Sequence, residues 1–293
     1  MVTTSHVTLQ EALERLYKAL RHEGIPDARL EAELLLAHTT SLSRAHLHVY
    51  PERELTSQQR GSLEAFLERR LRREPLAYIL ERKEFFGLEF AVRPGVMIPR
   101  PETELLVERA LILARQLAEG GRAPRVADIG TGCGNIAISL AVNVPGLHVY
   151  GVDSSSPALS VARENVRRHR VSDRITLLPG DLLTPLPERV DIIAANLPYV
   201  RRNALPLLQP EVRWEPAEAL DGGPDGLDVL RRLLEQAPRK LCRGGYVLME
   251  MDPDEREPLS REALARLPGA TLEVCKDLAG HERLLVARTP REG

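Results

Sequence analysis

The sequence contains few cysteines and few aromatic residues. Its 293 residues include three cysteines and one tryptophan, and aromatic side chains make up 4%. The cysteines, Cys133, Cys242 and Cys275, are odd in number and far apart, which argues against a disulfide framework and against a paired metal site. We therefore expect no bound metal and a reducing, cytoplasmic environment.

Long hydrophobic runs and a strong net charge are also missing. No apolar stretch reaches the roughly 18 residues of a membrane span. The amino-terminal MVTTSHVTLQEALERL has no basic segment followed by an apolar core, so it does not resemble a signal peptide. The formal net charge is -2, and no global field attracts nucleic acid or an anionic membrane. We expect a cytosolic protein that binds neither a membrane nor nucleic acid directly.

The residues that are present are typical of a globular protein. Hydrophobic residues make up 43% of the chain and charged residues 28%, enough to bury a substantial core. In the first 80 residues, leucines recur at helical spacing and Gly24, Pro26, Pro51 and Pro75 separate the stretches. Residues 1–80 are predicted to form a helical bundle. We interpret the arginines of ERRLRREP, residues 68–75, as a solvated helix face or a partner surface.

The amino-acid composition of the chain changes after this bundle. Residues 84–98, EFFGLEFAVRPGVMI, place aromatic and β-branched residues around Gly87, which predicts a β-hairpin linker over residues 81–99. From residue 100 to 293, short apolar runs alternate with helix-length segments, as in βαβ units. The last two runs are separated only by LAGH, too short for a crossover helix. The predicted fold class is α/β, with a mostly parallel sheet that ends in an antiparallel hairpin.

A glycine-rich turn follows the first of these strands. In VADIGTGCGNIAISLA, residues 126–141, glycines allow a tight turn and close approach of a ligand, and the following helix N-terminus favours a negative group. The next strand ends at Asp153, whose carboxylate can accept both hydroxyls of a ribose. The two features together predict a ligand that contains adenosine.

Two classes of adenosine ligand fit this turn. A dinucleotide fingerprint needs G-x-G-x-x-G, and Asn135 occupies the place of its last glycine. The turn resembles instead the S-adenosylmethionine loop of class I methyltransferases. That resemblance implies a set of cofactor-binding residues: Asp128, Gly130, Thr131, Gly132, Cys133, Gly134, Asp153, Ser154, Asp181, Leu182 and Asn196. For Leu182, packing within its loop is the alternative role.

The strand RVDIIAAN, residues 189–196, is followed by the second informative motif. NLPY, Asn196 to Tyr199, resembles the N-P-P-Y signature of methyltransferases that modify planar amino or amide nitrogens. The resemblance implies that the Asn196 side-chain oxygen and the Leu197 carbonyl accept the two N–H groups of an amide, while Tyr199 packs on its plane. Pro198 restricts Leu197 to extended geometry.

Leu197 departs from the signature, which has proline at this position. Leucine restores a backbone N–H and freedom in φ. Because the acceptor is a main-chain carbonyl, we expect activity to be retained.

Three longer segments extend the resemblance over most of the chain. Residues 74–108, 211–234 and 275–288 resemble segments of the HemK/PrmC family of protein-(glutamine-N5) methyltransferases. The family implies a substrate, the glutamine of the Gly-Gly-Gln motif in class I peptide chain release factors. It also implies that the helical bundle binds the release factor, and we expect a monomer.

Three other functions remain open on the sequence. They are a glutamine methyltransferase for ribosomal proteins, a nucleic-acid amino methyltransferase that flips its target base, and a non-catalytic S-adenosylmethionine-binding module. Arg100, Glu102 and Glu104 serve either as helix cap and ion-pair partners or as lining of the active-site mouth. Trp214 either covers the substrate entrance or belongs to the core.

Overall fold

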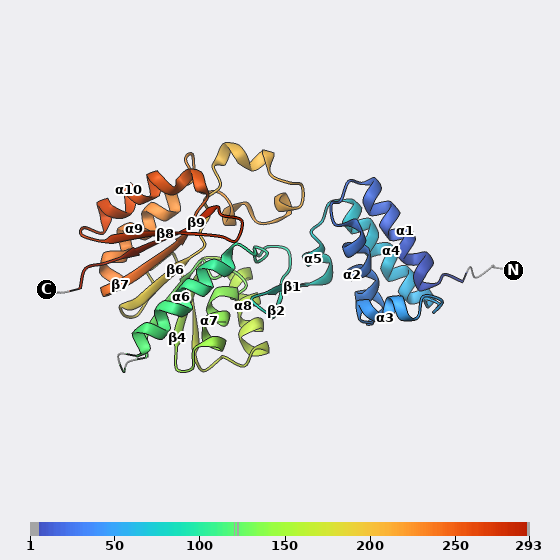
Figure 1. Cartoon of the computed structure of the whole chain (residues 1–293), viewed down its shortest axis with the longest axis horizontal. Coiled ribbons are helices and arrows are strands. Elements are labelled where there is room, and N and C mark those ends of the chain that lie inside the picture. Colours follow the sequence, from blue (N-terminus) through green and yellow to red (C-terminus); the bar gives the residue numbers. More distant parts are fainter. Residues whose placement is uncertain (1–5, 120, 122, 292–293) are drawn as a thin grey trace. The chain divides into compact units, whose positions relative to one another are not determined.

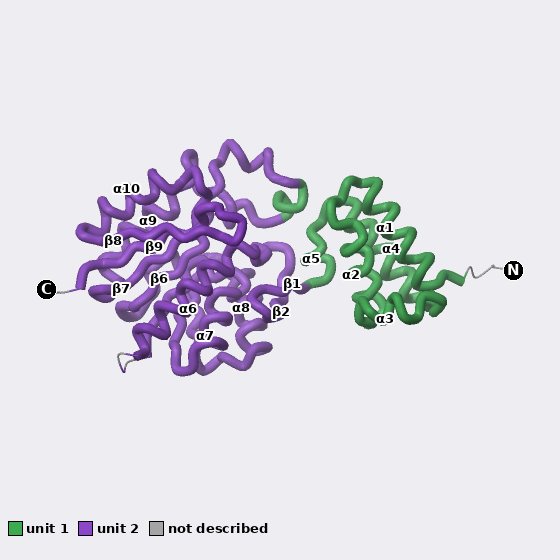
Figure 2. Tube along the Cα trace, viewed as in Figure 1, with its two compact units in different colours: residues 1–81, 210–214 green, residues 82–209, 215–293 purple. Residues whose placement is uncertain are grey.

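The chain forms two compact units in the computed structural model, which describes residues 6–119, 121 and 123–291. Unit 1 consists of Met1–Glu81 together with Pro210–Trp214, and unit 2 consists of Arg82–Gln209 together with Glu215–Gly293 (Figure 2). Residues 1–5 and 292–293, at the outer ends of the predicted domains, lie outside the described residues. Among the described residues, no helix combines the length and apolarity needed to cross a bilayer.

Unit 1 is a bundle of helices around a leucine-rich core (Figure 1). Its helices are α1 (Leu9–His22), α2 (Ala28–Thr40), α3 (Arg44–Val49), α4 (Ser57–Leu71) and α5 (Leu76–Leu80). Capping boxes start two of them, Thr8 with Glu11 in α1 and Thr56 with Gln59 in α4. Each box satisfies backbone N–H groups that a helix start leaves unpaired, which explains where these helices begin.

An ion-pair cluster lies within unit 1, around Arg70 of α4. Arg70 is only 3% exposed; its Nε lies 2.6 Å from a carboxylate oxygen of Glu31, and its Nη1 lies 3.0 Å from one of Glu211. Arg73 also pairs with Glu211, at 2.8 Å. The interpretation of this arginine-rich segment as a solvated face or partner surface is therefore wrong for Arg70. Its paired carboxylates make the burial of the guanidinium tolerable.

Unit 2 is built on a seven-stranded sheet in the order β5-β4-β3-β6-β7-β9-β8. The strands are β3 (Arg125–Ile129), β4 (His148–Asp153), β5 (Ile175–Pro179), β6 (Val190–Ala195), β7 (Leu241–Glu250), β8 (Thr271–Lys276) and β9 (Glu282–Arg288). All neighbours are parallel except β9, which is antiparallel to β7 and β8. The predicted parallel sheet with a closing antiparallel hairpin is confirmed.

Helices and short 3-10 turns connect these strands. The helices are α6 (Thr103–Ala118), α7 (Asn135–Asn143), α8 (Ser156–Arg168), α9 (Asp228–Lys240) and α10 (Arg256–Arg266); the turns are η1 (Arg202–Leu207), η2 (Val212–Trp214), η3 (Ala217–Ala219) and η4 (Pro253–Glu255). Helix α7 packs against α6 and α8, and α9 packs against α10 (Figure 1). Every residue of β6 is buried, as expected for a central strand covered on both faces.

The strand order determines where a ligand site can form. From β3 the chain adds β4 and β5 on one side and later adds β6 and β7 on the other. In parallel sheets of this kind, ligands bind outside the carboxyl ends of the strands where the order reverses. The Gly130 turn after β3, Asp153 at the end of β4 and Asn196 after β6 all lie at this edge.

A two-stranded hairpin precedes α6. Strands β1 (Arg82–Phe85) and β2 (Leu88–Ala91) pair antiparallel within unit 2. Its Ala91 donates its N–H to Asn165 Oδ1 at 2.8 Å and accepts from Asn165 Nδ2 at 3.0 Å. The Phe86 N–H donates to Glu104 Oε1 at 2.8 Å. These bonds attach the hairpin to α8 and α6.

We predict that Arg70→Ala destabilises unit 1 by about 3 kcal/mol, because it leaves partly buried carboxylates without their cation. Chemical denaturation followed by circular dichroism measures the change. Arg72→Ala is the matched control, since Arg72 is 72% exposed and meets Glu68 only at 3.8 Å; its effect should stay within about 0.5 kcal/mol. Equal stability of the two variants would contradict a structural role for Arg70.

Candidate active site

The glycine turn between β3 and α7 forms one wall of a cavity. Gly130, Gly132 and Gly134 have φ angles of 73°, 57° and 86°, a region that side-chain-bearing residues rarely adopt. The N–H groups of Gly130 and Thr131 both donate to the Val152 carbonyl at 2.9 Å, which holds the turn against β4. A Cβ at Gly132 would meet only the Gly130 carbonyl oxygen, at 3.9 Å. The space beside Gly132 is therefore open to a ligand.

Asp153 forms the acidic part of the same wall. Its Oδ2 accepts from the Gly132 N–H at 2.9 Å, and its Oδ1 accepts from the Ser155 N–H at 2.8 Å. Burial raises the pKa of this carboxyl, although these backbone hydrogen bonds oppose the shift. Each oxygen retains a lone pair for another donor, so the carboxylate can still bind two adjacent hydroxyls.

Loops from several strands complete the cavity. Lining residues include Gly130, Gly132, Asp153, Ser154, Asp181, Leu182, Asn196, Leu197 and Pro198. Leu182 is buried and supplies an apolar wall, while Asp181 makes an ion pair with Arg232 at 2.5 Å. Thr131 and Cys133 line an adjoining smaller cavity, together with Gly130, Gly132 and Asn196. The structure thus brings most of the predicted cofactor residues to one place.

Two of the predicted residues support the turn from outside these cavities. Asp128 is fully buried; its Oδ2 accepts from the Thr131 hydroxyl at 2.5 Å and from the Ala137 N–H at 3.0 Å. Burial raises the pKa of Asp128 to about 7. Gly134 is the residue before α7, and a Cβ there would lie 3.0 Å from Ile138 Cδ1. Both residues shape the turn and the start of α7.

Cys133 is a buried residue of the turn. Burial raises the pKa of its thiol to about 12, so the reactive thiolate is scarce at neutral pH. Its neighbours include no metal-binding cluster, because no group of three His, Cys, Asp or Glu residues within residues 6–119, 121 and 123–291 could hold a metal ion.

Asn196 extends from the end of β6 toward the amino-terminal end of α6. Its Nδ2 donates to Thr103 Oγ1 at 2.9 Å. This bond uses one of the two Nδ2 protons and leaves Oδ1 as the acceptor that Asn196 can offer to a ligand in the cavity it lines. Thr103 lies outside the motifs that the sequence shows, although it is the first residue of the helix that follows IPRPE.

Leu197, the departure from the N-P-P-Y signature, has a buried side chain in the core of unit 2. Its Cδ2 would lie 3.0 Å from a Cβ at Gly130. The leucine therefore fills space beneath the glycine turn.

Tyr199 takes a different place from the other three residues of the motif. Its hydroxyl donates to Glu250 Oε1 at 3.2 Å, and burial together with the Glu250 charge raises its pKa. Its ring packs against the core of unit 2. The predicted contact of Tyr199 with a substrate amide stays a prediction.

The loop DGGPDGLD, residues 221–228, packs on the backbone of Tyr199. The Val200 N–H donates to the Leu220 carbonyl at 3.0 Å, and the Gly222 N–H donates to the Val200 carbonyl at 2.9 Å. A Cβ on Gly222 would lie 2.7 Å from Tyr199 Cα, and one on Gly226 would lie 2.5 Å from the Tyr199 carbonyl oxygen. Only glycine allows this approach, so the loop holds the end of the NLPY motif in place.

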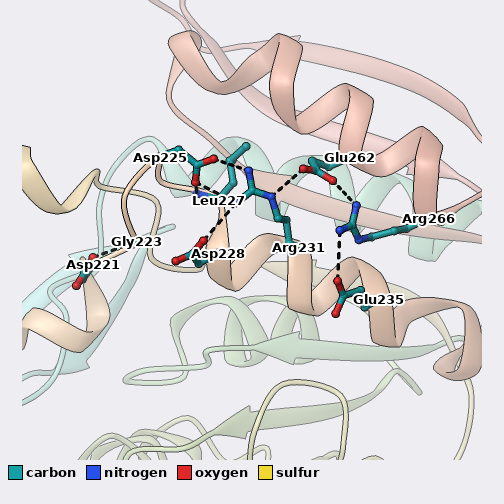
Figure 3. Close-up of polar contacts among 9 residues, drawn as sticks. All are labelled: Asp221, Gly223, Asp225, Leu227, Asp228, Arg231, Glu235, Glu262 and Arg266. Atoms are coloured by element: carbon teal, nitrogen blue, oxygen red, sulfur yellow. Dashed lines mark hydrogen bonds and ion pairs between the residues drawn. The ribbon is translucent and has the colours of Figure 1, made fainter.

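Ion pairs hold this loop to α9 and α10 (Figure 3). Arg231 pairs with Asp225 of the loop, with Asp228 at 3.2 Å and with Glu262 of α10 at 2.7 Å. The hydrogen bonds to these carboxylates raise the pKa of Arg231. Arg266 bonds Glu262 and Glu235 in turn (Figure 3). Backbone hydrogen bonds to Val200 and the ion pairs of Arg231 thus anchor the loop at both ends.

The sequence also singled out Arg100, Glu102 and Trp214. Arg100 pairs with the buried Glu215, whose Oε2 also accepts from the Ile98 N–H at 3.0 Å. Glu102 precedes α6 without a side-chain cap bond. Trp214 belongs to unit 1 and is 43% exposed, so the alternative that it is a core residue is wrong.

The fold and this site define a class I, S-adenosylmethionine-dependent methyltransferase. A mostly parallel sheet carries the glycine turn after β3 and Asp153 at the end of β4, and Leu182 forms an apolar wall of the same cavity. The same fold occurs in a 16S rRNA methyltransferase of T. thermophilus solved with S-adenosylmethionine and guanosine, at a TM-score of 0.51 and 22% identity over 71% of this chain and 49% of that one.

Sequence comparisons define the family within this class. Residues 11–80 match the PrmC N-terminal domain, and residues 106–209 match the methyltransferase small domain. The chain is 41% identical to the release factor glutamine methyltransferase of Moorella thermoacetica, over 96% of this chain and 98% of that one. It is 41% identical to that of Geobacter sulfurreducens, over 85% and 86%.

The chain belongs to the release factor glutamine methyltransferase family. The resemblance to HemK/PrmC enzymes is thereby confirmed, as are the predicted enzyme class and its cofactor, S-adenosylmethionine.

We predict that Gly222→Ala lowers both methyl-transfer activity and thermal stability. The new Cβ would overlap backbone atoms of Tyr199 and Gly226, and relieving such overlap typically costs about 1–3 kcal/mol. Gly61→Ala in α4 is the control: nothing lies within 4 Å of a Cβ there, so it should be neutral or stabilising by about 0.5–1 kcal/mol. Unchanged melting temperature and turnover in Gly222→Ala would refute the proposed packing.

Proposed function

We propose that this enzyme transfers a methyl group to the side-chain amide nitrogen, N5, of the glutamine in the Gly-Gly-Gln motif of class I peptide chain release factors, and so modulates translation termination. The observation that carries the proposal is the Asn196–Thr103 hydrogen bond, 2.9 Å long. It leaves Asn196 Oδ1 available in the cavity that Asp153 and the glycine turn also line. A hydrogen-bond acceptor at this point suits a substrate with N–H donors.

The chemistry of an amide explains why acceptors are needed. The nitrogen of a glutamine side chain is a weak nucleophile because its lone pair is delocalised into the carbonyl. When bound, S-adenosylmethionine supplies a methyl group on a positively charged sulfur as the electrophile. Asn196 Oδ1 and the Leu197 carbonyl would hold the two N–H groups and orient the nitrogen for in-line attack, about 3 Å from the carbon. As the N–C bond would form, the bond between the methyl carbon and sulfur would break; the nitrogen becomes more acidic and its proton can leave to solvent.

Neighbouring residues restrict the geometry of these two acceptors. Pro198 disfavours helical geometry at Leu197 and so helps to aim the carbonyl. The buried Leu197 side chain anchors the same residue beneath Gly130. We expect these two constraints to compensate for the proline that the motif lacks at 197.

The cofactor residues divide into contacts and supports. We propose that Asp153 binds the ribose hydroxyls, that Leu182 packs on the adenine and that Gly130 and Gly132 contact the cofactor through main chain. Asp181 and Ser154 lie beside them in the cavity lining. Asp128 and Gly134 act by shaping the turn.

The rest of the chain has proposed roles as well. Residues 1–80 would bind the release factor, residues 81–99 would form the connecting hairpin, and residues 100–293 would carry out methyl transfer. We further propose that the enzyme acts as a monomer in the cytoplasm, where release factors work on the ribosome.

Incubation with methyl-labelled S-adenosylmethionine and a purified release factor tests the substrate. We expect label on the native release factor and none on a variant whose Gly-Gly-Gln glutamine is changed to alanine. Mass spectrometry of the tip peptide should show one added methyl group. Label on both proteins, or on neither, would contradict the proposed function. In a parallel incubation with ribosomes, label on ribosomal protein or RNA without label on the release factor would identify a different substrate class.

Two substitutions should separate catalysis from cofactor binding. Asn196→Ala removes a group that orients the substrate, so turnover should fall by at least about 100-fold while the Kd for S-adenosylmethionine changes little. Asp153→Ala removes a charged hydrogen-bond partner, so that Kd should rise about tenfold or more. Calorimetry and turnover assays measure both quantities.

Asp173→Ala, at a carboxylate with a 78% exposed side chain, is the matched control and should change neither. Full turnover in Asn196→Ala would refute the proposed hydrogen bond between Asn196 and the substrate amide.

A further inference from the structure

Residues 95–100 form a wall that two neighbouring cavities share. Residues 95–97 line the larger cavity, which Asp153 also lines, and residues 97–100 line the smaller one. Asn196 lines both cavities. The cofactor and the substrate amide would therefore meet beside this segment, and its position affects the geometry between them.

The segment lies between two regular elements. Strand β2 ends at Ala91, and α6 begins at Thr103. In such an irregular segment, backbone N–H groups need partners other than those of a strand or helix. Two buried side chains from distant parts of the chain supply partners near its two ends.

Glu215 holds the end of the segment that leads into α6. Its side chain is 1% exposed. Oε2 accepts from the Ile98 N–H at 3.0 Å, and Oε1 accepts from the Arg100 guanidinium. Burial raises the pKa of this carboxyl, while the Arg100 charge and the two hydrogen bonds oppose the shift. One carboxylate thus fixes both the backbone and a side chain of the segment.

The residues that follow Glu215 belong to the same site. Pro216, Glu218 and Ala219 line the larger cavity. Glu215 therefore connects two cavity-lining segments, residues 95–100 and residues 216–219. Because a buried carboxylate is costly without its hydrogen-bond donors, this connection opposes movement of one segment away from the other.

Asn165 of α8 holds the chain just before the segment. It is fully buried; Oδ1 accepts from the Ala91 N–H at 2.8 Å, and Nδ2 donates to the Ala91 carbonyl at 3.0 Å. Nδ2 also donates to the Cys133 carbonyl of the glycine turn at 2.9 Å. Since an amide nitrogen has two protons, both are used. Asn165 thereby fixes the end of β2 relative to the glycine turn.

We propose that Glu215 and Asn165 are positioning residues for methyl transfer. Glu215 fixes residues 97–100 in the wall of the cavity where Asn196 would hold the substrate amide, and Asn165 fixes the glycine turn that would contact the cofactor. Both act through the residues that they hold. This inference rests on the proposed function, because it concerns the geometry between the cofactor and a glutamine amide.

The two residues should affect different steps of the reaction. The partners of Glu215 line the smaller cavity with Asn196, so its loss should lower kcat with little change in the Kd for S-adenosylmethionine. Asn165 bonds the glycine turn, whose Gly132 N–H donates to Asp153, so its loss should raise that Kd. A general loss of stability would not separate the two quantities.

Glu215→Leu and Glu215→Gln test the first residue in turnover assays with a purified release factor. Leucine fills similar space without an acceptor, a change that buried ion-pair sites often tolerate. The wall would be misplaced, and kcat should fall about tenfold or more. Glutamine keeps an acceptor for the Ile98 N–H, so kcat should fall only about threefold. Calorimetry should show little change in the Kd for S-adenosylmethionine in either variant.

Asn165→Asp and Asn165→Ala test the second residue. Aspartate places an oxygen where Nδ2 donates to two carbonyls, and the repulsion should displace the turn and raise the Kd for S-adenosylmethionine about tenfold. Alanine removes the same bonds without adding a charge and should raise this Kd as well.

Glu164→Ala is the matched control. It breaks an ion pair of 2.6 Å with Arg93, which lies two residues before the segment, but the two side chains are 37% and 45% exposed. Exposed pairs of this kind contribute little. Both kcat and the Kd for S-adenosylmethionine should therefore stay close to those of the natural enzyme.

The outcomes separate this inference from the proposed function. If the natural enzyme methylates the glutamine, natural kcat in both Glu215 variants or natural cofactor affinity in both Asn165 variants refutes the positioning roles. Parallel losses of kcat and cofactor affinity at both positions refute them too, since they indicate lost stability alone. Circular dichroism identifies a variant that has not folded, and the second variant at that position then carries the test. If the natural enzyme does not methylate the glutamine, the proposed function itself fails.

Discussion

The parallel register of β4, β3 and β6 is the constraint on which the rest of the site depends. Because all three strands run in the same direction, their carboxyl ends meet at one edge of the sheet. Asp153 ends β4, while the glycine turn follows β3 and Asn196 follows β6. Hydrogen bonds from Gly130 and Thr131 to the Val152 carbonyl then lock the turn against its neighbour.

Several carboxyl groups near the site are buried and are compensated by hydrogen bonds. Asp128, Asp153 and Glu250 are carboxyl groups whose pKa values burial raises, and each is partly compensated by hydrogen bonds from hydroxyl or backbone donors. Burying such groups is unfavourable unless they are hydrogen-bonded. Asp128 stabilises the turn, Asp153 lines the cavity and Glu250 accepts a hydrogen bond from the Tyr199 hydroxyl. The same kind of group thus serves three purposes, which depend on the donors around it.

The backbone of the NLPY motif is held in place by its neighbours. The NLPY backbone has the Gly130 turn on one side and the glycine-rich loop at residues 221–228 on the other. Ion pairs of Arg231 with Asp225 and Glu262 hold that loop to two helices (Figure 3). Small residues allow close approach of the backbones, and charged residues farther along the chain fix the loop. Positioning an amide for attack requires a support of this kind.

Local sequence patterns were sufficient for the architecture. Helical leucine spacing predicted the bundle, alternating apolar runs predicted the parallel sheet, and the short LAGH connection predicted the antiparallel end. The glycine turn, Asp153 and NLPY were also recognisable, because each motif is a short continuous segment whose residue types reflect one local requirement. The interpretation failed where burial decided the role, as at Arg70, which looked solvated and is paired inside unit 1.

The sequence by itself determined the family, the cofactor class and the order of strands and helices, because these depend on periodicity and on contiguous motifs. Only the tertiary structure decided that Thr103 meets Asn196 across 93 positions of chain, that Tyr199 bonds Glu250, and that Gly222 packs on the Tyr199 backbone. Those contacts join residues far apart in the chain, and their partners are selected by the packing of strands and helices and by the need to satisfy polar groups once they are buried. No local pattern contains that information.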